Sequence, residues 1–321
     1  MTLKNSRQAS LKDYQMKNLI VILLATILLM ACNGKDYFNQ GKAAFDKKDY
    51  KNAIAYFDSA LVENPNDASA LATRGSARYN LDNYEGAMAD YTKSIEYWPK
   101  NSDNEVELAA IYSDLADCYF NLKLYDAAIE NYTVAITKNN NLAIAYSGRG
   151  DAYIIKDKPT LAQPDFEKAI SIDASLANAH YGLGNVKYDL KDFAAAIPHY
   201  NQAINLDPTV IKFYMDRGDS YYMTEDYPKA IDDFTKAIEL DSSYAKAYVF
   251  RGDAKDYLDR SQEAIEDYNK ALELNPNYDL AYFGRGAARK SLNDKKGACE
   301  DFKKALELGY EEAESYVKEC K

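Results

Sequence analysis

The side chains that could do chemistry in this 321-residue chain are mostly carboxylates, with 50 Asp and Glu against 2 His and 4 Cys. Two histidines, His180 and His199, are too few for a His-rich metal site, and neither has an obvious nucleophile partner. Gly182 and Gly184 lack the third glycine of a dinucleotide-binding loop, and the chain has no Walker loop, no Cys-x-x-Cys and no His-Glu-x-x-His motif. We therefore expect no enzymatic activity, no bound metal and no cofactor.

The overall charge narrows the classes of partner. The formal net charge is −11 at pH 7, which argues against a basic nucleic-acid-binding surface. Tyrosine is unusually frequent, with 29 Tyr against 11 Phe and 1 Trp. The repeat described next accounts for much of this excess, because many of the tyrosines fall at recurring packing positions.

One pattern of small and aromatic residues recurs eight times with a period of 34 residues. A glycine begins the pattern in seven units, and Ala116, displaced by seven residues, takes its place in the third. An alanine follows twelve residues later and an aromatic residue four positions after that. Small residues allow two antiparallel helices to approach closely, and the aromatic ring fills the gap to the next pair. The aromatic residues are Phe57, Tyr91, Tyr132, Phe166, Tyr200, Phe234, Tyr268 and Phe302.

This pattern resembles the tetratricopeptide repeat family over about residues 34–312. The resemblance implies an all-α fold, a right-handed superhelical solenoid of about eight helix-turn-helix repeats. The repeat domain, residues 36–312, is followed by a capping helix at 313–321 that covers the open end. The expected repeats span about 34–67, 68–101, 109–142, 143–176, 177–210, 211–244, 245–278 and 279–312, with an insertion at 102–108.

The N-terminus has the pattern of a secretion signal. A basic flank that includes Lys17 precedes twelve apolar residues, Leu19 to Met30, which are too few to span a membrane. The run ends in Leu-Met-Ala-Cys32, which resembles a bacterial lipobox. We expect a signal peptide at 1–31, lipid attachment at Cys32 and a short stub at 32–35, which places the protein in the bacterial cell envelope, at the outer membrane facing the periplasm or the cell surface. An ordinary membrane anchor, or cleavage without lipid, stays open as an alternative, as does translation from Met16.

Arginine and aspartate occur together in five of the repeats. The arginine stands just before the repeat glycine, the aspartate follows sixteen residues later, and the other three repeats lack both. In an antiparallel helix pair these positions face each other, so we predict structural ion pairs rather than catalytic residues. Recent duplication of a unit that contained both residues is a compatible explanation. The pairs are Arg74 with Asp90, Arg149 with Asp165, Arg217 with Asp233, Arg251 with Asp267, and Arg285 with Asp301.

The resemblance also places a partner-binding groove on the concave face, which first helices line. Carboxylates interleaved with aromatic rings there suit peptides or proteins with basic and apolar side chains. The alternative is a solvated face of an acidic protein. The predicted groove residues are Asp114, Asp117, Asp151, Tyr181, Tyr188, Asp189, Asp216, Asp219, Tyr222, Phe250, Asp253, Asp256 and Tyr257.

One role that occurs in the family is disfavoured. Repeats of this family that hold the acidic C-termini of chaperones use a clamp of Lys, Arg and Asn. The corresponding positions here are Phe38, Ala72, Thr73, Ser113 and Asp114, and none is basic. A cytoplasmic co-chaperone would also require that residues 1–31 are not a signal.

Two local features add expectations. Ser102 and Glu105 have capping-box spacing, so we predict that the first helix of the third repeat starts early and runs about two turns longer. Cys118 is expected to be a small buried residue. Cys299 and Cys320 lie on successive helices, and spacing alone leaves open whether they form a disulfide.

The sequence thus predicts a non-enzymatic, membrane-anchored scaffold or adaptor that binds partner proteins in an acidic, aromatic-lined groove. A lipoprotein that carries a glycan or a secreted substrate is the main alternative, because aromatic rings beside aspartates also suit sugars. A cytoplasmic co-chaperone is the third interpretation.

Overall fold

A computed structural model describes residues 36–99 and 104–320, in which every regular element is a helix. The predicted signal peptide, Cys32 and Ser102 lie outside these residues, so their roles stay predictions. Within the described part of the chain, no helix is both long enough and apolar enough to cross a lipid bilayer.

First and second helices of the repeats alternate along the chain. Residues 36–46 form the first helix of the first repeat. The other first helices are α3 (Ala68–Tyr79), α5 (Glu105–Asn121), α7 (Ala143–Ile155), α9 (Ala177–Asp189), α11 (Ile211–Met223), α13 (Ala245–Asp256) and α15 (Asp279–Ser291). The second helices are α2 (Tyr50–Glu63), α4 (Tyr84–Tyr97), α6 (Tyr125–Lys138), α8 (Pro159–Ile172), α10 (Phe193–Leu206), α12 (Tyr227–Leu240), α14 (Ser261–Leu274) and α16 (Lys295–Glu307). A final helix, α17 (Ala313–Glu319), follows.

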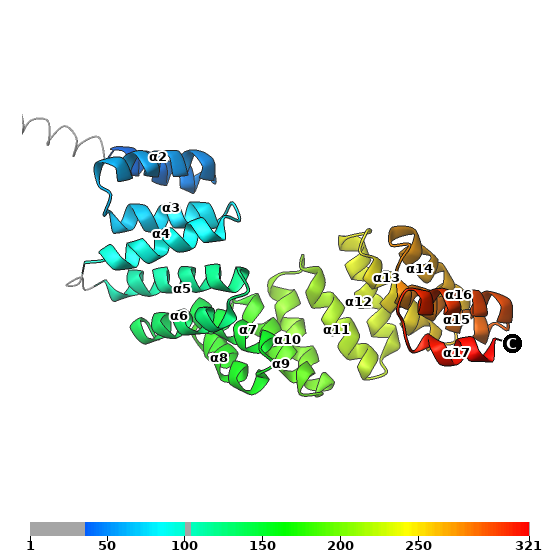
Figure 1. Ribbon diagram of the computed structural model, residues 1–321. Coiled ribbons are helices and arrows are strands. Elements are labelled where there is room, and N and C mark those ends of the chain that lie inside the picture. The colour runs from blue at the N-terminus through cyan, green and yellow to red at the C-terminus, as the bar shows by residue number, and fades with distance from the viewer. Residues whose placement is uncertain (1–35, 100–103, 321) are drawn as a thin grey trace, which may run out of the picture. The chain divides into compact units, whose positions relative to one another are not determined.

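The chain divides into two compact units, one ending at Ala152 and the other beginning at Tyr153, within α7. Inside each unit, consecutive helices pack against each other in chain order, as Figure 1 shows for α2 to α6 and for α9 to α17. Each unit is therefore an all-helical repeat solenoid, because every layer contacts only its neighbours in sequence.

A tight turn of fixed geometry joins the two helices of every repeat. In the first repeat, the N–H of Lys48 bonds to the carbonyl of Phe45 and the N–H of Asp49 bonds to the carbonyl of Ala44, a Schellman arrangement. Asp49 then caps α2 by accepting from the N–H of Asn52. The residue in the left-handed conformation is not glycine in any of these turns, so no glycine marks the turn in the sequence. It is Lys48, Asp82, Lys123, Asp157, Lys191, Glu225, Asp259 or Asn293, with φ between 55° and 64°.

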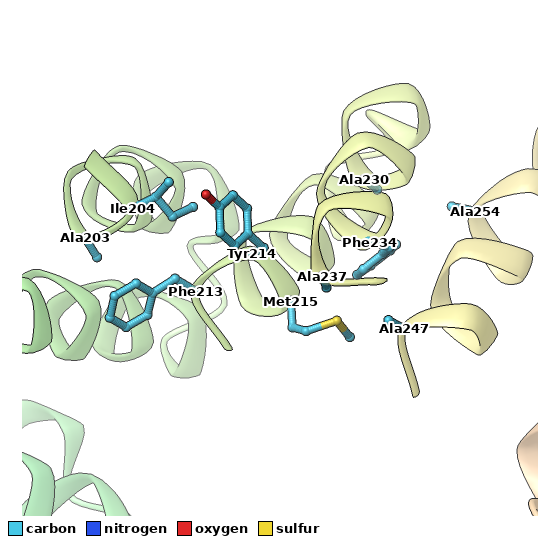
Figure 2. Packing of buried hydrophobic residues seen from close by; sticks show 10 residues of the cluster. All are labelled: Ala203, Ile204, Phe213, Tyr214, Met215, Ala230, Phe234, Ala237, Ala247 and Ala254. Atoms are coloured by element: carbon cyan, nitrogen blue, oxygen red, sulfur yellow. The ribbon is translucent and has the colours of Figure 1, made fainter. Parts of the chain in front are cut away.

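The repeat glycines make room for aromatic rings. A Cβ on Gly252 would lie 2.9 Å from the ring of Tyr268, and a Cβ on Gly284, in the next repeat, would lie 2.6 Å from it. The ring is thus held between two first helices, as the sequence pattern predicted. Figure 2 shows an equivalent cluster in the second unit, where Phe234 of α12 lies close to α13.

Replacement of Gly182 by alanine is expected to destabilise the protein by about 1–3 kcal/mol, because overpacking costs more than the helix propensity that alanine adds. The new Cβ would lie 2.3 Å from the ring of Phe166. Urea unfolding followed by circular dichroism measures the change. The double variant Phe166→Leu/Gly182→Ala should lose less unfolding free energy than the sum of the losses in the two single variants. A single variant at least as stable as the wild type would show that this packing has been misjudged.

The third repeat starts early, but less early than predicted. Its first helix α5 begins at Glu105, four residues before the repeat frame at 109, which is about one extra turn rather than two. The reason is the cap: the side chain of Asn104 accepts a hydrogen bond from the N–H of Glu107 and fixes the helix start there.

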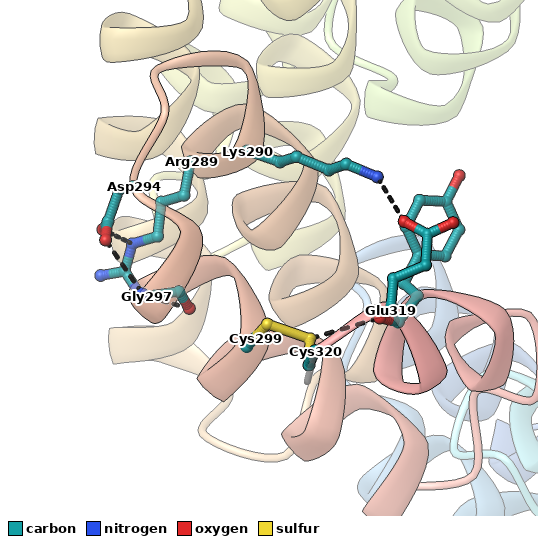
Figure 3. Close-up of a disulfide and its surroundings, with 8 residues drawn as sticks. Arg289, Lys290, Asp294, Gly297, Cys299, Glu319 and Cys320 are labelled. Carbon is teal, nitrogen blue, oxygen red and sulfur yellow. Dashed lines mark hydrogen bonds and ion pairs between the residues drawn. A yellow bond between two sulfur atoms is a disulfide. The ribbon is translucent and has the colours of Figure 1, made fainter.

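The last helix is tied to the repeat before it. α17 packs on α16, and a disulfide joins Cys299 to Cys320 (Figure 3). This answers the question that helical spacing left open. Cys118 is free and buried on α5, as expected.

Candidate functional site

Four of the predicted Arg–Asp pairs form bidentate bridges between the helices of one repeat. Arg217 donates from Nε to Oδ2 of Asp233 at 2.8 Å and from Nη2 to Oδ1 at 2.5 Å, and only 6% of the Asp233 side chain is exposed. In the fifth pair, Arg149 lies in the first unit and Asp165 in the second, and their bridge stays a prediction. The other three pairs are Arg74 with Asp90, Arg251 with Asp267, and Arg285 with Asp301.

Each of the five arginines also reaches back to the preceding repeat, a contact that was not predicted from the sequence. The Nη1 of Arg217 donates to Oδ1 of Asn201 on α10 at 2.7 Å, sixteen residues before the arginine. Each of the other four arginines also donates to a side chain sixteen residues before it. A hydrogen-bond acceptor at that spacing is therefore the sequence signal for this contact. The arginines thus connect neighbouring repeats and have a structural role. The other acceptors are Asp58 for Arg74, Thr133 for Arg149, Thr235 for Arg251 and Asn269 for Arg285.

Most of the predicted groove residues are only partly accessible. Asp189 and Tyr257 are exposed. The half-buried ones are Asp114, Asp117, Asp151, Tyr181, Tyr188, Asp216, Asp219, Tyr222, Phe250, Asp253 and Asp256.

Tyrosine hydroxyls hold several of the groove carboxylates in place. Tyr181 donates to Asp216 at 2.5 Å and Tyr188 donates to Asp219 at 2.5 Å, so two pairs of predicted groove residues are brought together. These carboxylates are positioned by neighbouring repeats, which a freely solvated face would not require. Two further tyrosines donate from second helices: Tyr132 to Asp117 at 2.5 Å and Tyr268 to Asp253 at 2.6 Å.

From their spacing, these second-helix tyrosines are expected to serve packing alone. Where the repeat aromatic residue is tyrosine, its hydroxyl donates to the residue just after the repeat glycine, or after Ala116, fifteen positions earlier. This spacing could have revealed the contact from the sequence. The pairs are Tyr91 with Ser76, Tyr132 with Asp117, Tyr200 with Asn185, and Tyr268 with Asp253.

Equivalent positions in the two units surround a small cavity. The cavity in the first unit has a volume of about 110 Å³ and is lined by Ser76, Tyr79, Asn80, Tyr91, Asp114 and Asp117. The cavity in the second unit has a volume of about 210 Å³ and is lined by Ile154, Asn185, Tyr188, Asp189, Tyr200, Asp216 and Asp219. Neither lining contains a basic residue.

The carboxylates of the first cavity are costly to ionise. Burial, followed by the charge of Asp117, raises the pKa of Asp114 to about 7. Burial also raises the pKa of Asp117 to about 6, although the hydrogen bond from Tyr132 opposes the shift. A cation placed between these carboxylates would favour their ionised form, so the cavity suits a group with several N–H donors.

The chain's own lysines occupy part of the groove in the second unit. The Nζ of Lys212 lies 4.5 Å from the centre of the Tyr181 ring, and the Nζ of Lys246 lies 4.9 Å from the centre of the Phe250 ring. These two rings therefore already have cation partners, which were not predicted from the sequence. The cavity that contains Asp114 is thus the better candidate for a cationic group from a partner.

The described residues include no group of three or more His, Cys, Asp or Glu arranged to hold a metal ion. The cavity around Asp114 and Asp117 instead presents hydrogen-bond acceptors, negative charge and aromatic surface. That combination suits recognition of a partner's side chains.

Comparison with known families agrees with the helix pattern. The family described as tetratricopeptide repeat matches residues 38–105, 109–140, 143–176, 177–210, 211–244 and 280–308, and the family described as TPR repeat matches residues 258–293. Together these matches cover most of the chain.

Two curated relatives match over short stretches. The chain is 38% identical over 64 residues to a STIP1 homologue from Dictyostelium discoideum, and 30% identical over 108 residues to the Hsp70-Hsp90 organising protein of Plasmodium falciparum. These stretches are 20% and 34% of this chain. The chain spans only 11% and 19% of the length of these relatives.

Solved structures show similar folds. YrrB, described as a TPR protein with an unusual peptide-binding site, is 25% identical, with 60% of this chain and 95% of that chain covered and a TM-score of 0.50. The C-terminal part of a TPR repeat-containing protein from Cytophaga hutchinsonii is 19% identical, with 77% and 98% covered and a TM-score of 0.58. PilF of Pseudomonas aeruginosa is 16% identical, with 67% and 100% covered and a TM-score of 0.58. The last two support the fold alone.

Proposed function

Because this chain belongs to the tetratricopeptide repeat family, we propose that it is a non-enzymatic interaction scaffold whose first-helix face binds a basic, partly apolar segment of a partner protein. The observation that carries this proposal is the cavity around Asp114 and Asp117. It combines two desolvated carboxylates with aromatic walls, and no basic residue lines it.

Both the charged head and the apolar stem of a lysine or arginine side chain would find suitable contacts in this cavity. The charged head would lie between the carboxylates of Asp114 and Asp117, and the apolar stem would pass along the rings of Tyr79 and Tyr91. The volume of the cavity around Asp114 and Asp117, about 110 Å³, has room for one such head group but not for a helix. An extended segment is the simplest partner, because it can present single side chains to successive repeats.

The same proposal includes anchoring in the bacterial envelope through a lipid on Cys32. The basic flank, the apolar run and the Leu-Met-Ala-Cys32 sequence support it. The disulfide between Cys299 and Cys320 also supports it, because disulfides persist in oxidising compartments. Labelling of cells with a radioactive fatty acid tests the anchor: wild type should be labelled, and Cys32→Ala should not.

A chaperone partner is not carried over from the curated relatives. The matches cover small parts of those proteins, and none of the positions that correspond to the basic clamp is basic here. Asp114, at one of these positions, carries the opposite charge in its ionised form. A peptide with an acidic C-terminus is therefore expected to bind poorly to this face.

A peptide-binding experiment tests the proposal. A labelled peptide with one lysine among apolar residues should bind at pH 8, as measured by fluorescence anisotropy, and its norleucine analogue should bind at least tenfold more weakly. Norleucine keeps the apolar stem and removes the charge. The variant Asp114→Asn/Asp117→Asn should lose the preference for lysine, whereas Asp46→Asn, which changes an exposed helical aspartate in the same unit, should keep it.

Two results would contradict the proposal. Equal binding of the lysine and norleucine peptides would show that the cavity does not recognise charge. Binding on a glycan array that the double Asp variant abolishes, without binding of the lysine peptide, would favour the carrier interpretation.

A further inference from the structure

The last complete repeat has lysine at two contacting positions where five earlier repeats have aromatic residues. In five earlier repeats an aromatic residue late in the first helix contacts an aromatic residue at the start of the second. The fourth repeat has Ile154 and Pro159 at these positions, and the seventh has Asp256 and Ser261. The rings of Tyr222 and Tyr227 are 5.4 Å apart, as are those of equivalent residues in the first unit, Tyr79 and Tyr84, at 5.3 Å. The positions equivalent to Tyr222 and Tyr227 in the last repeat are Lys290 and Lys295. Two positive charges thus replace an apolar contact.

In the sixth repeat the end of the following first helix covers this position. Tyr257, just after α13, stacks on Tyr227 at 5.1 Å and meets the edge of Tyr222 at 5.4 Å. The helix that follows the last repeat, α17, has 7 residues and ends at Glu319, whereas first helices of inner repeats have 12 to 17. Beside Lys290 and Lys295, the place that Tyr257 takes over the sixth repeat corresponds to a cavity.

A cavity of about 380 Å³ lies at this place, larger than the cavity around Asp114. Its apolar wall is formed by Phe302 and Tyr316, whose rings are 4.7 Å apart, and by the disulfide. The disulfide and the contact between these two rings hold α17 against α16. Its polar lining is formed by Lys290, Asn293, Lys295 and Glu319.

The lysines of this cavity are suited to bind carboxylates. Lys290 already binds one: its Nζ lies 2.9 Å from Oε2 of Glu319, as Figure 3 shows, and 5.0 Å from the centre of the Tyr316 ring. Lys295 is exposed, and its side chain has no ion-pair partner among the residues that the structure describes. The surrounding segment, residues 285–304, has seven basic and three acidic residues in a chain with a net charge of −11.

We propose that this end cavity binds a glutamate or aspartate side chain of an acidic helix from a partner protein, which continues the stack of helices beyond α17. The position argues for a helix, because in the sixth repeat it is filled by Tyr257 at the end of the next first helix. The charge argues for an acidic one, because Lys290 and Lys295 replace the aromatic pair. The apolar wall would contact the stem of the bound side chain. This site is separate from the cavity around Asp114 and prefers the opposite charge.

The proposal is tested with a defined helical peptide and the full oxidised protein. The probe is a fluorescein-labelled 13-residue alanine-based helix with two glutamates one turn apart, and the same helix with glutamine is its control. The glutamate peptide should bind, and Lys290→Gln/Lys295→Gln should weaken it at least tenfold. The matched variant Lys236→Gln/Lys270→Gln removes the same charge from exposed second-helix lysines and should leave binding unchanged. The charge-reversed variant Lys290→Glu/Lys295→Glu should instead bind a lysine-containing helix.

Three outcomes would overturn the proposal: equal binding of the glutamate and glutamine helices, equal loss in the two lysine variants, or lysine-dependent binding to phosphatidylglycerol vesicles without binding of the acidic helix. Cys320→Ser should weaken peptide binding by releasing α17 from α16. Asp114→Asn/Asp117→Asn should leave it unchanged, which keeps the failure of this proposal distinct from failure of the proposed groove.

Discussion

Replacement of Arg217 by alanine is expected to lower the free energy of unfolding by about 3–5 kcal/mol, because it leaves a buried carboxylate without its cation. Asp233 is 6% exposed and receives two hydrogen bonds from this guanidinium. The same change removes the hydrogen bond to Asn201, which weakens the packing of the preceding repeat on α11. Urea unfolding monitored by circular dichroism gives the difference.

Lys229→Ala is the matched control for this prediction. Lys229 pairs with Asp226 on the surface, with 59% of its side chain exposed, and such pairs contribute less than about 1 kcal/mol. The double variant Arg217→Met/Asp233→Leu should recover much of the loss, because it removes both charges and keeps apolar volume. Equal midpoints for Arg217→Ala and Lys229→Ala would show that the bridge does not stabilise the fold.

Asp114→Asn is expected to stabilise the free protein by about 2–4 kcal/mol at pH 8, because it removes a carboxylate that is costly to ionise. The pKa of Asp114 in the folded protein is about 7, above its value in an unfolded chain. The protonated form therefore contributes stability that is complete below about pH 4 and is lost as the pH rises through about 7. Wild-type stability should fall over that interval, and the variant should fall less.

This prediction separates stability from binding. The variant Asp114→Asn should be more stable than wild type at pH 8 and should bind the lysine peptide more weakly, which is the trade-off expected at a site kept for recognition. Asp46→Asn should change neither property. If Asp114→Asn were less stable than wild type at pH 8, the hydrogen bonds of the ionised carboxylate would outweigh its desolvation.

The period of 34 residues by itself determined the alternation of helices, since small and aromatic residues recur wherever two helices must approach closely. The pairing of Arg217 with Asp233 was equally readable, because both residues are present or absent together and the antiparallel geometry sets them opposite each other. These features depend on contacts within one repeat, where distance in sequence fixes distance in space. The early start of α5 was also predicted, although the cap at Asn104 made the extra segment shorter.

The tertiary structure decided which side chains meet. Examples are the second contact of Arg217 with Asn201, the hydroxyl that Tyr132 directs at Asp117, and the lysines above Tyr181 and Phe250. Regular spacing can place such residues near each other, but the direction of each side chain decides whether they meet. The disulfide between Cys299 and Cys320 depends on how closely α17 packs on α16. The raised pKa of Asp114 depends on the tertiary structure most strongly. Burial and the charge of Asp117 act together only when α3, α4 and α5 have packed together.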